Sequence, residues 1–222
     1  RGGSRSWVEH TEKAYTQSVS FGVDALEFSC NESKDGVWFG LHNRTFESLG
    51  GPVTDPHTMT WEEIKAALPA NKIPARLDWL LDRYGQTHCL VIDPKYRAGE
   101  WKRLLKYITD RNVTPAQIVI KYGDSNWLFE QAKAEGCGAW GYAYTSDTTE
   151  PWYETFKSST GPLDFLSMQW DAPANVVNDL RASNKPVVAH VLDDQTQYVR
   201  AAQNGMRSAI VAGVKGVLQR QC

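Results

Sequence analysis

The stretch that decides the fold runs from Ala25 to Cys30 and reads Ala-Leu-Glu-Phe-Ser-Cys. This short apolar run is followed at 33–36 by Ser-Lys-Asp-Gly, which is typical of a turn. We therefore predict a strand and, after the turn, a second strand at Val37–Leu41. Successive side chains of a strand point to opposite faces, so Glu27 and Ser29 share one face. The stretch predicts a strand that carries polar side chains on one side of a sheet.

Similar short segments recur along the chain and alternate with amphipathic ones. Further strands are expected at Leu90–Asp93, Gln117–Lys121, Gly138–Tyr144, Leu163–Gln169, Pro186–Val191 and Ser208–Val211. Helices are expected at Glu9–Phe21, Ala75–Tyr84, Trp101–Arg111, Ser125–Glu135, Thr149–Lys157, Ala174–Ala182 and Asp194–Asn204, with a short helix near the C-terminus. One more short helix is expected after Thr60, because the spacing of Thr60 and Glu63 is that of a capping box.

This alternation predicts right-handed βαβ units and a mainly parallel sheet, and therefore an α/β fold. A closed barrel and an open, doubly wound sheet are both compatible with the spacing. The first expected strand is not followed by a G-x-G-x-x-G sequence, which argues against a dinucleotide-binding fold. In a barrel, active residues lie at the C-terminal ends of the strands, so candidate site residues are sought there.

Composition excludes several classes of protein. The chain has 222 residues, of which 41% are hydrophobic, enough for one sizeable core, and we expect a single domain over 1–222. A formal net charge of −2 gives no basic excess that would indicate a nucleic-acid partner. The apolar runs are too short to cross a bilayer. The four cysteines are scattered without metal-ligand spacing, so we expect no disulfide.

Polar side chains lie at the ends of four expected strands. They are Glu27 with Ser29, His42, Asp93 with Lys95, and His190. Carboxylate oxygens suit Mg²⁺ or Ca²⁺, a lysine suits a phosphate oxygen, and a histidine exchanges protons near neutral pH. Together they indicate metal-assisted phosphoester cleavage. Each residue alone is also compatible with a structural role, and His10, His57 and His88 are expected to be surface or loop residues.

These residues belong to a series of motifs in which the chain resembles the glycerophosphodiester phosphodiesterase family over nearly its whole length. Arg1-Gly2-Gly3 resembles His-Arg-Gly without its histidine, and Val8–Thr11 stands where Pro-Glu-Asn-Thr is expected. Residues 22–29 resemble the metal-binding strand, and Lys34-Asp35-Gly36 leads to the histidine of His42-Asn43. Three later segments, Thr60–Ile64, Ile73–Leu77 and Ile92–Lys95, resemble the motifs that follow, the last one being Glu-x-Lys with a shorter acid.

The resemblance implies a TIM-type (β/α)8 barrel with a phospholipase-C-like phosphodiesterase architecture. It implies a divalent metal, Mg²⁺ or Ca²⁺, held by Glu27, Asp93 and Ser29. Arg1 and Lys95 would neutralise the oxygens of a phosphodiester substrate. His42 would act as the acid for the leaving group, with Arg1 beside it and a second histidine expected immediately before Arg1.

Three departures from the family pattern bear on function. Ser29 replaces an aspartate, which weakens the metal site, and His190 replaces a tryptophan, as a polar group of the pocket or as a packing change. The first barrel strand and the first histidine are absent, so we expect the sequence to begin within a motif of a longer chain. A barrel opened at its first strand would leave two unpaired edges.

The serine and the nine tryptophans are similar to actinobacterial and phage relatives, including tail-associated proteins. This similarity predicts a cell-envelope polyol-phosphate polymer or a lipid head group as substrate. It also predicts an extracellular, cell-surface or virion-associated location, with other domains or subunits of a larger assembly as partners. Two alternatives remain open: a catalytically weakened barrel that serves as a glycan-binding, phosphate-binding or structural module, and an unrelated metal-dependent barrel hydrolase or aldolase.

Overall fold

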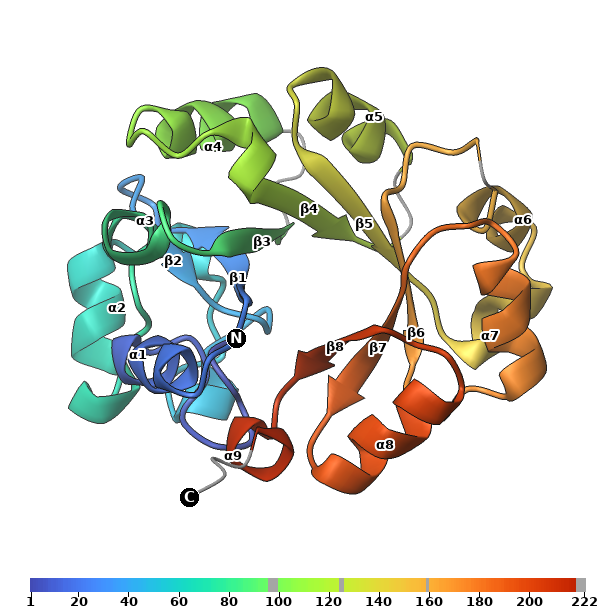
Figure 1. Cartoon of the computed structure of the whole chain (residues 1–222). Coiled ribbons are helices and arrows are strands. Elements are labelled where there is room, and N and C mark those ends of the chain that lie inside the picture. Colours follow the sequence, from blue (N-terminus) through green and yellow to red (C-terminus); the bar gives the residue numbers. More distant parts are fainter. Residues whose placement is uncertain (96–99, 124–125, 159, 219–222) are drawn as a thin grey trace. The chain divides into compact units, whose positions relative to one another are not determined.

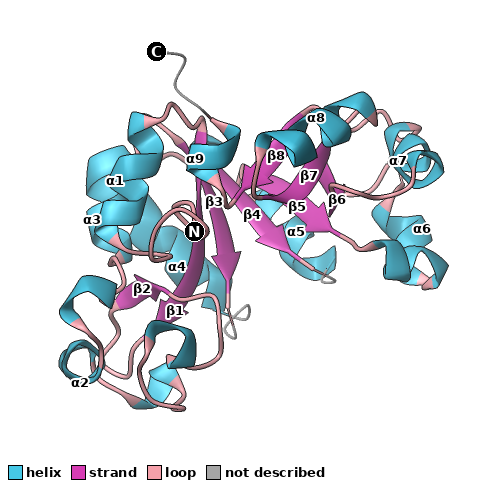
Figure 2. Cartoon of the chain, turned by 90° about the horizontal axis from the view of Figure 1, so that it is seen from below, coloured by secondary structure: helices cyan, strands magenta, loops and turns pink. Residues whose placement is uncertain are grey.

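The computed structural model describes residues 1–95, 100–123, 126–158 and 160–218. The chain forms two compact units, Arg1–Ile118 and Val119–Cys222, which are called unit 1 and unit 2 (Figure 1). In each unit the helices lie against one face of the strands, as Figure 2 also shows. The two units are described in turn. Within the described residues, no helix combines the length and the apolar character needed to span a membrane.

Unit 1 is built on three strands. They are β1 (Ala25–Glu32), β2 (Trp38–Gly40) and β3 (Cys89–Pro94), and the helices are α1 (Glu12–Ser20), α2 (Trp61–Ala67), α3 (Leu77–Tyr84) and α4 (Trp101–Thr109). Strand β1 pairs with β2 in antiparallel and with β3 in parallel orientation, in a register that sets Ser29 opposite Asp93. One face of β1 is apolar and buried, with Leu26, Phe28 and Cys30 at most 2% exposed.

The turn between β1 and β2 is fixed by hydrogen bonds of its own side chains. Asp35 accepts a hydrogen bond from the Ser33 hydroxyl at 2.6 Å and another from the Trp61 backbone N–H, the first residue of α2, at 2.9 Å. The bond from Ser33 holds the pKa of the Asp35 carboxyl below its ordinary value. Gly36 has a φ of 85°, which glycine adopts without strain. The turn predicted from composition is thus also an anchor for α2.

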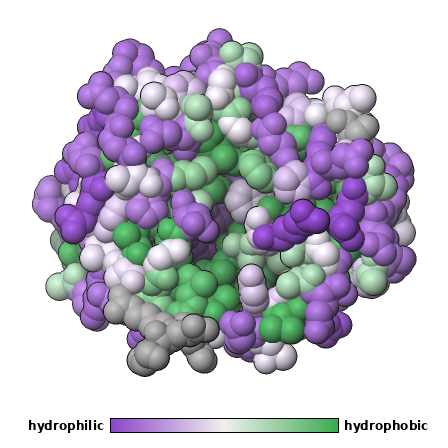
Figure 3. Space-filling model, in the orientation of Figure 1, coloured by the Kyte–Doolittle hydropathy of each residue, from purple (hydrophilic) through white to green (hydrophobic). Residues whose placement is uncertain are grey.

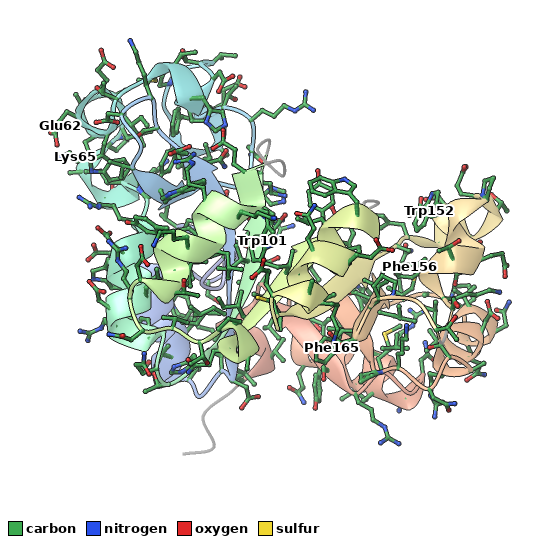
Figure 4. The ribbon with its side chains drawn as sticks, turned by 90° about the horizontal axis from the view of Figure 1, so that it is seen from above. Glu62, Lys65, Trp101, Trp152, Phe156 and Phe165 are labelled. Carbon is green, nitrogen blue, oxygen red and sulfur yellow. The ribbon has the colours of Figure 1, made fainter. Side chains whose placement is uncertain are left out.

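Unit 2 is a five-stranded parallel sheet in chain order. Its strands are β4 (Ile118–Tyr122), β5 (Gly138–Tyr142), β6 (Phe165–Gln169), β7 (Val187–Leu192) and β8 (Ser208–Val211). The helices are α5 (Asn126–Ala134), α6 (Trp152–Phe156), α7 (Ala174–Arg181), α8 (Gln195–Gln203) and α9 (Val214–Val217). A buried apolar cluster that includes Leu166, Met168 and Leu180 forms its core. On α6 the rings of Trp152 and Phe156 meet edge to face, with 5.7 Å between their centroids (Figure 4).

Amphipathic helices cover the strands. Helix α4 buries Trp101, Leu104, Leu105 and Ile108, which lie on one stripe of the helix. Trp101 is among the side chains labelled in Figure 4, and only 1% of it is exposed. Hydrophilic residues predominate over the helices on the face drawn in Figure 3. Burial of such a stripe contributes about 1.5–3 kcal/mol for each large apolar side chain.

An ion pair between a half-exposed guanidinium and a buried carboxylate joins α4 to the end of β1. The guanidinium of Arg103 makes two hydrogen bonds to the carboxylate of Glu32, which is 4% exposed, and also binds Glu100. The same guanidinium lies 4.8 Å from the centroid of the Trp38 ring. A charge buried in this way is stable only while its partner is present.

Most element predictions are confirmed, and the differences have local causes. Helix α1 begins at Glu12 and not at Glu9, because His10 has a φ of 57°, outside the helical range, and Thr11 caps the helix through Ala14 N–H at 3.2 Å. The capping box of Thr60 and Glu63 is present. The predicted start of α5 at Ser125 lies outside the described residues, as does Cys222. Cys30, Cys89 and Cys137 are free thiols.

Candidate functional site

The register of β1 and β3 brings three predicted site residues together. The Ser29 Oγ lies 3.5 Å from the Asp93 Oδ2, at the long limit of a hydrogen bond. The Lys95 Nζ lies 2.7 Å from the same Asp93 oxygen and forms a salt bridge with it. Because Asp93 is 3% exposed and the Lys95 side chain 17%, this is a largely buried ion pair. Lys95 is held in place by its backbone N–H, which donates to the Cys30 carbonyl at 2.9 Å.

The Arg1 end of the chain lies beside Glu27, on the same face of β1 as Ser29. The backbone nitrogen of Arg1 is 2.9 Å from the Glu27 carbonyl oxygen and 3.4 Å from a carboxylate oxygen of Glu27. The Arg1 guanidinium is 3.4 Å from the carboxylate of Glu9, which stands in the segment resembling Pro-Glu-Asn-Thr. The two motifs at the start of the chain therefore support each other, and Glu9 orients the predicted phosphate-binding arginine.

His42 is partly exposed, and the charges of Arg1, Lys95 and Asp93 act on its ring. Its Nδ1 is 3.0 Å from the Asn43 Oδ1, and an amide oxygen only accepts, so Nδ1 carries a proton and Nε2 is the acceptor of the neutral ring. Burial lowers the pKa of His42, the charges of Arg1 and Lys95 lower it further, and the Asn43 bond and the Asp93 charge raise it. The net effect favours the neutral imidazole, poised to accept a proton at Nε2.

His10 lies in the turn before α1, as predicted, but it is not on the surface. His10 is 1% exposed, and its Nδ1 lies 2.8 Å from the Tyr15 hydroxyl, which donates to the Glu27 carbonyl at 2.9 Å. Its ring packs edge to face on Phe28, and a Cβ at Gly40 would lie 2.8 Å from its Nδ1. Burial is the main cause that lowers its pKa. His10 thus supports β1 from the apolar face, behind Glu27.

His190 belongs to a different cluster, in unit 2. Its Nδ1 lies 2.7 Å from the Ser167 Oγ, and Ser167 donates to the Val188 carbonyl at 2.9 Å, so Nδ1 is the donor. The Tyr144 ring lies edge to face on His190 with 5.1 Å between centroids. The Tyr142 ring lies nearby, and the Lys121 Nζ is 5.0 Å from the centroid of that ring. The residues at the ends of β4 to β7 therefore form an aromatic and polar group that the sequence indicated only through His190.

The oxygen donors of unit 1 are of the kind that a hard divalent cation prefers. Within the described residues, no group of three His, Cys, Asp or Glu side chains could hold a metal ion. Glu27 and Asp93 supply two carboxylates, and Ser29 supplies a hydroxyl on the same side. Asn31, further along that face of β1, is 0% exposed, and its Oδ1 has no hydrogen-bond partner within the described part of the chain. Oxygen donors in this number suit Mg²⁺, which usually keeps several waters and one or two carboxylates.

Comparison with solved structures shows the fold. A glycerophosphodiester phosphodiesterase from Thermotoga maritima has a TM-score of 0.78 and 16% identity, and the match covers 97% of this chain and 93% of that one. An Oleispira antarctica phosphodiesterase in complex with the product sn-glycerol-3-phosphate has a TM-score of 0.78 and 15% identity, covering 98% of this chain and 92% of that one. The fold is therefore that of the TIM-barrel phosphodiesterases, as predicted.

Comparison of sequences matches the N-terminal part of the chain. Residues 1–86 match the Glycerophosphoryl diester phosphodiesterase family, and this part carries Glu27, Ser29 and His42, so the predicted resemblance is found over these residues. Lysophospholipase D GDPD3 of Mus musculus is 34% identical over 64 residues. That match covers 29% of this chain and 19% of the mouse protein, so the chain spans about a fifth of this relative.

Proposed function

We propose that the chain is a phosphoric diester hydrolase that cleaves glycerophosphodiester-type bonds. The observation that carries the proposal is the buried Lys95–Asp93 pair beside Ser29, with His42 in the field of Arg1, Lys95 and Asp93. Cationic groups suit the phosphoryl oxygens, and a histidine suits proton transfer to the oxygens that flank phosphorus. The family match over residues 1–86 supports the same reaction.

The proposed mechanism assigns one task to each side chain. The Lys95 ammonium and the Arg1 guanidinium hold the non-bridging oxygens and neutralise the charge that develops on them. Glu27, Asp93 and Ser29 would hold a divalent cation, Mg²⁺ or Ca²⁺, which would add polarisation of a phosphoryl oxygen when bound. Water or a hydroxyl of the substrate releases its proton to solvent and forms the new bond to phosphorus. The bond from phosphorus to the leaving alcohol breaks, and the leaving oxygen takes a proton from His42. The products are an alcohol and a phosphomonoester, or a cyclic phosphodiester when the substrate hydroxyl attacks.

His42 is proposed to protonate the leaving oxygen from Nε2. Asn43 fixes the ring through Nδ1 and leaves Nε2 to exchange the proton. In the free chain the neutral ring is favoured, because burial, Arg1 and Lys95 lower the pKa of His42. The negative charge of a bound phosphodiester acts in the opposite direction. We therefore expect the substrate to raise the pKa of His42 and to favour the protonated imidazole, which can act as the acid.

Hydrolysis of a chromogenic phosphodiester tests the proposal. We expect activity that is lost with a chelator, restored by Mg²⁺ or Ca²⁺, and reduced about 10²–10⁴-fold by His42→Ala. His88→Ala is the matched control, because the His88 ring bonds its neighbour Thr87 and packs on Tyr84, away from the proposed site residues. Activity that is indifferent to both chelator and His42→Ala would refute the assignment.

The substrate is proposed to be a polyol-phosphate polymer of a cell envelope, of the teichoic-acid kind, or a phospholipid head group. The support is the similarity of Ser29 and the tryptophan-rich sequence to actinobacterial and phage relatives, some of them tail-associated. On this proposal the chain acts extracellularly, at a cell surface or on a virion, with other domains or subunits as partners. Hydrolysis of purified polymer and of glycerophosphodiesters, compared at equal phosphodiester concentration, decides between a polymer and a small substrate.

Ser29 favours a second candidate, a barrel that binds its ligand and turns it over slowly or not at all. A serine hydroxyl is a neutral ligand, and the described residues hold no third carboxylate at the site. In that case the wild-type chain binds the polymer without releasing phosphomonoester. Ser29→Asp separates the candidates, because a restored carboxylate should increase turnover only where the remaining groups are competent.

A further inference from the structure

Asn31 is a buried polar residue that neither the sequence motifs nor the proposed mechanism uses. It belongs to β1, is 0% exposed, and lies two residues after Ser29. Four residues of extended strand span about 13 Å, so Asn31 is too far along β1 from Glu27 to share a cation with it. Its Nδ2 donates a hydrogen bond to the Leu41 carbonyl at 2.6 Å. Asn31 therefore contacts the residue that leads directly into His42.

Leu41 lies where the chain leaves β2, and both of its backbone polar groups are bonded to β1. The pairing of β1 with β2 ends at Cys30 and Gly40. One residue later, the Leu41 N–H donates to the Ser29 carbonyl at 2.9 Å, and the Leu41 carbonyl accepts from the Asn31 side chain. A side chain of β1 thus bonds the carbonyl of the first residue after β2.

The Leu41 side chain gives this point a further attachment. It is 1% exposed and packs in a buried apolar cluster with Phe39 and Phe46. The hydrogen bond between Asn31 and the Leu41 carbonyl is also buried. A buried carbonyl costs free energy unless a donor bonds it. The orientation of the Leu41 carbonyl therefore depends on the amide of Asn31.

The peptide group between Leu41 and His42 connects this bond to the proposed acid. The group is planar, so a bond to the Leu41 carbonyl also fixes the direction in which the His42 backbone starts. The His42 ring is fixed separately, because its Nδ1 lies 3.0 Å from the Asn43 Oδ1. Proton transfer requires Nε2 to lie within hydrogen-bond reach of the leaving oxygen, and a displacement of about 1 Å can cost about 10²-fold in rate.

We propose that Asn31 is a positioning residue for His42: by bonding the carbonyl of the preceding peptide, it directs the imidazole toward the leaving oxygen. This inference rests on the proposed phosphodiesterase function, in which His42 is the acid. Asn31 acts through His42 and touches neither the substrate nor the cation. Its effect on turnover therefore exists only while His42 is present, whereas a purely structural effect would persist without His42.

A double-mutant cycle of Asn31→Leu with His42→Ala tests the proposal. Leucine has nearly the size of asparagine but no donor. In the wild-type background, Asn31→Leu should lower kcat for a chromogenic phosphodiester about 10–10²-fold and leave KM nearly unchanged. In the His42→Ala background it should have no further effect, because the group that Asn31 positions is already gone. An equal fold-change in both backgrounds would overturn the proposal.

Ser183→Ala is the matched control, in unit 2. Ser183 is also buried, and its hydroxyl donates to a backbone carbonyl, that of Leu180, at 2.7 Å. The substitution removes a buried bond of the same kind and should leave kcat unchanged in both backgrounds. A loss as large as that of Asn31→Leu would show that turnover responds to any such bond, and it would also overturn the proposal.

A measurement on the wild-type chain covers the case in which Asn31→Leu does not fold. With ¹⁵N-labelled asparagine, the Nδ2 protons of Asn31 should exchange with solvent much more slowly than those of Asn112, which is exposed. Equal exchange rates would show that the bond to Leu41 does not persist in solution, and they overturn the inference alone. A wild-type chain without phosphodiesterase activity overturns the proposed function and the inference with it.

Discussion

The two units of the chain differ in what they bury. Among the described residues, unit 1 buries His10, Thr11, Ser18, Ser29, Asn31, Glu32, Ser33 and Asp93, and unit 2 buries only Ser167, Ser183 and His190 as polar side chains. The carboxylates in this set, Glu32 and Asp93, are both in unit 1. Buried polar groups cost free energy unless they are paired, and they are typical of functional sites. The difference indicates that the chemistry is concentrated in unit 1, where the family match also lies.

The strongest test of this difference compares one histidine from each unit. We expect His42→Ala to lower kcat about 10²–10⁴-fold, because it removes the proton-transfer group. His190→Ala should reduce kcat less, because His190 is tied to Ser167 and packed on Tyr144 in the other unit. Steady-state hydrolysis of a phosphodiester measures both. An equal loss in the two variants would place the chemistry in both units.

Removing the partner of a buried charge should give the largest loss of stability. Lys95→Met leaves the Asp93 carboxylate buried and unpaired, and we expect the free energy of unfolding to fall by about 3–5 kcal/mol. The control is Lys65→Met, which breaks the exposed Glu62–Lys65 pair labelled in Figure 4 and should cost about 0–1 kcal/mol. Urea denaturation of both variants gives the comparison, and equal midpoints would show that the Lys95 pair is not buried in solution.

The two histidines of unit 1 predict the pH dependence of stability. Burial is the first cause that lowers the pKa of both His10 and His42 in the folded chain, so the unfolded chain binds more protons at acid pH. By linkage, stability rises with pH between the folded values and the unfolded value of about 6.5, and it is lost as pH falls through this window. His10→Gln should flatten the dependence of the urea midpoint between pH 7.5 and 5. An unchanged slope would show that His10 is not the main source.

The smallest effects should be alike in the two units, because helix caps act locally. Thr60→Ala removes the cap of α2, and Asp194→Ala removes the hydrogen bond to Gln197 N–H that caps α8. Each should cost about 0.5–2 kcal/mol. Thermal unfolding measures both. A much larger loss for Thr60→Ala would show that the turn at Asp35, which also binds α2, depends on the cap.

The strands were predictable because short apolar runs recur along the chain between amphipathic segments. The alternation of side chains along an extended strand placed Glu27 with Ser29 and Asp93 with Lys95. His10 was not predictable, since its burial depends on a backbone φ of 57° and on contacts with Tyr15 and Phe28 from other elements. The neighbours of His190, Ser167 and Tyr144, come together through strand register, which residue patterns do not specify.

The ion pair between Arg103 and Glu32 has a consequence for the evolution of this chain. Loss of Arg103 leaves the buried Glu32 carboxylate without this partner, so replacement of Arg103 alone is costly. Loss of Glu32 is less costly, because the Arg103 side chain is half exposed and also binds Glu100. The Trp38 ring faces the same guanidinium and adds a second contact that depends on Arg103. We therefore expect descendants that keep Glu32 to keep Arg103, and frequent neutral residues at position 103 beside Glu32 would contradict that expectation.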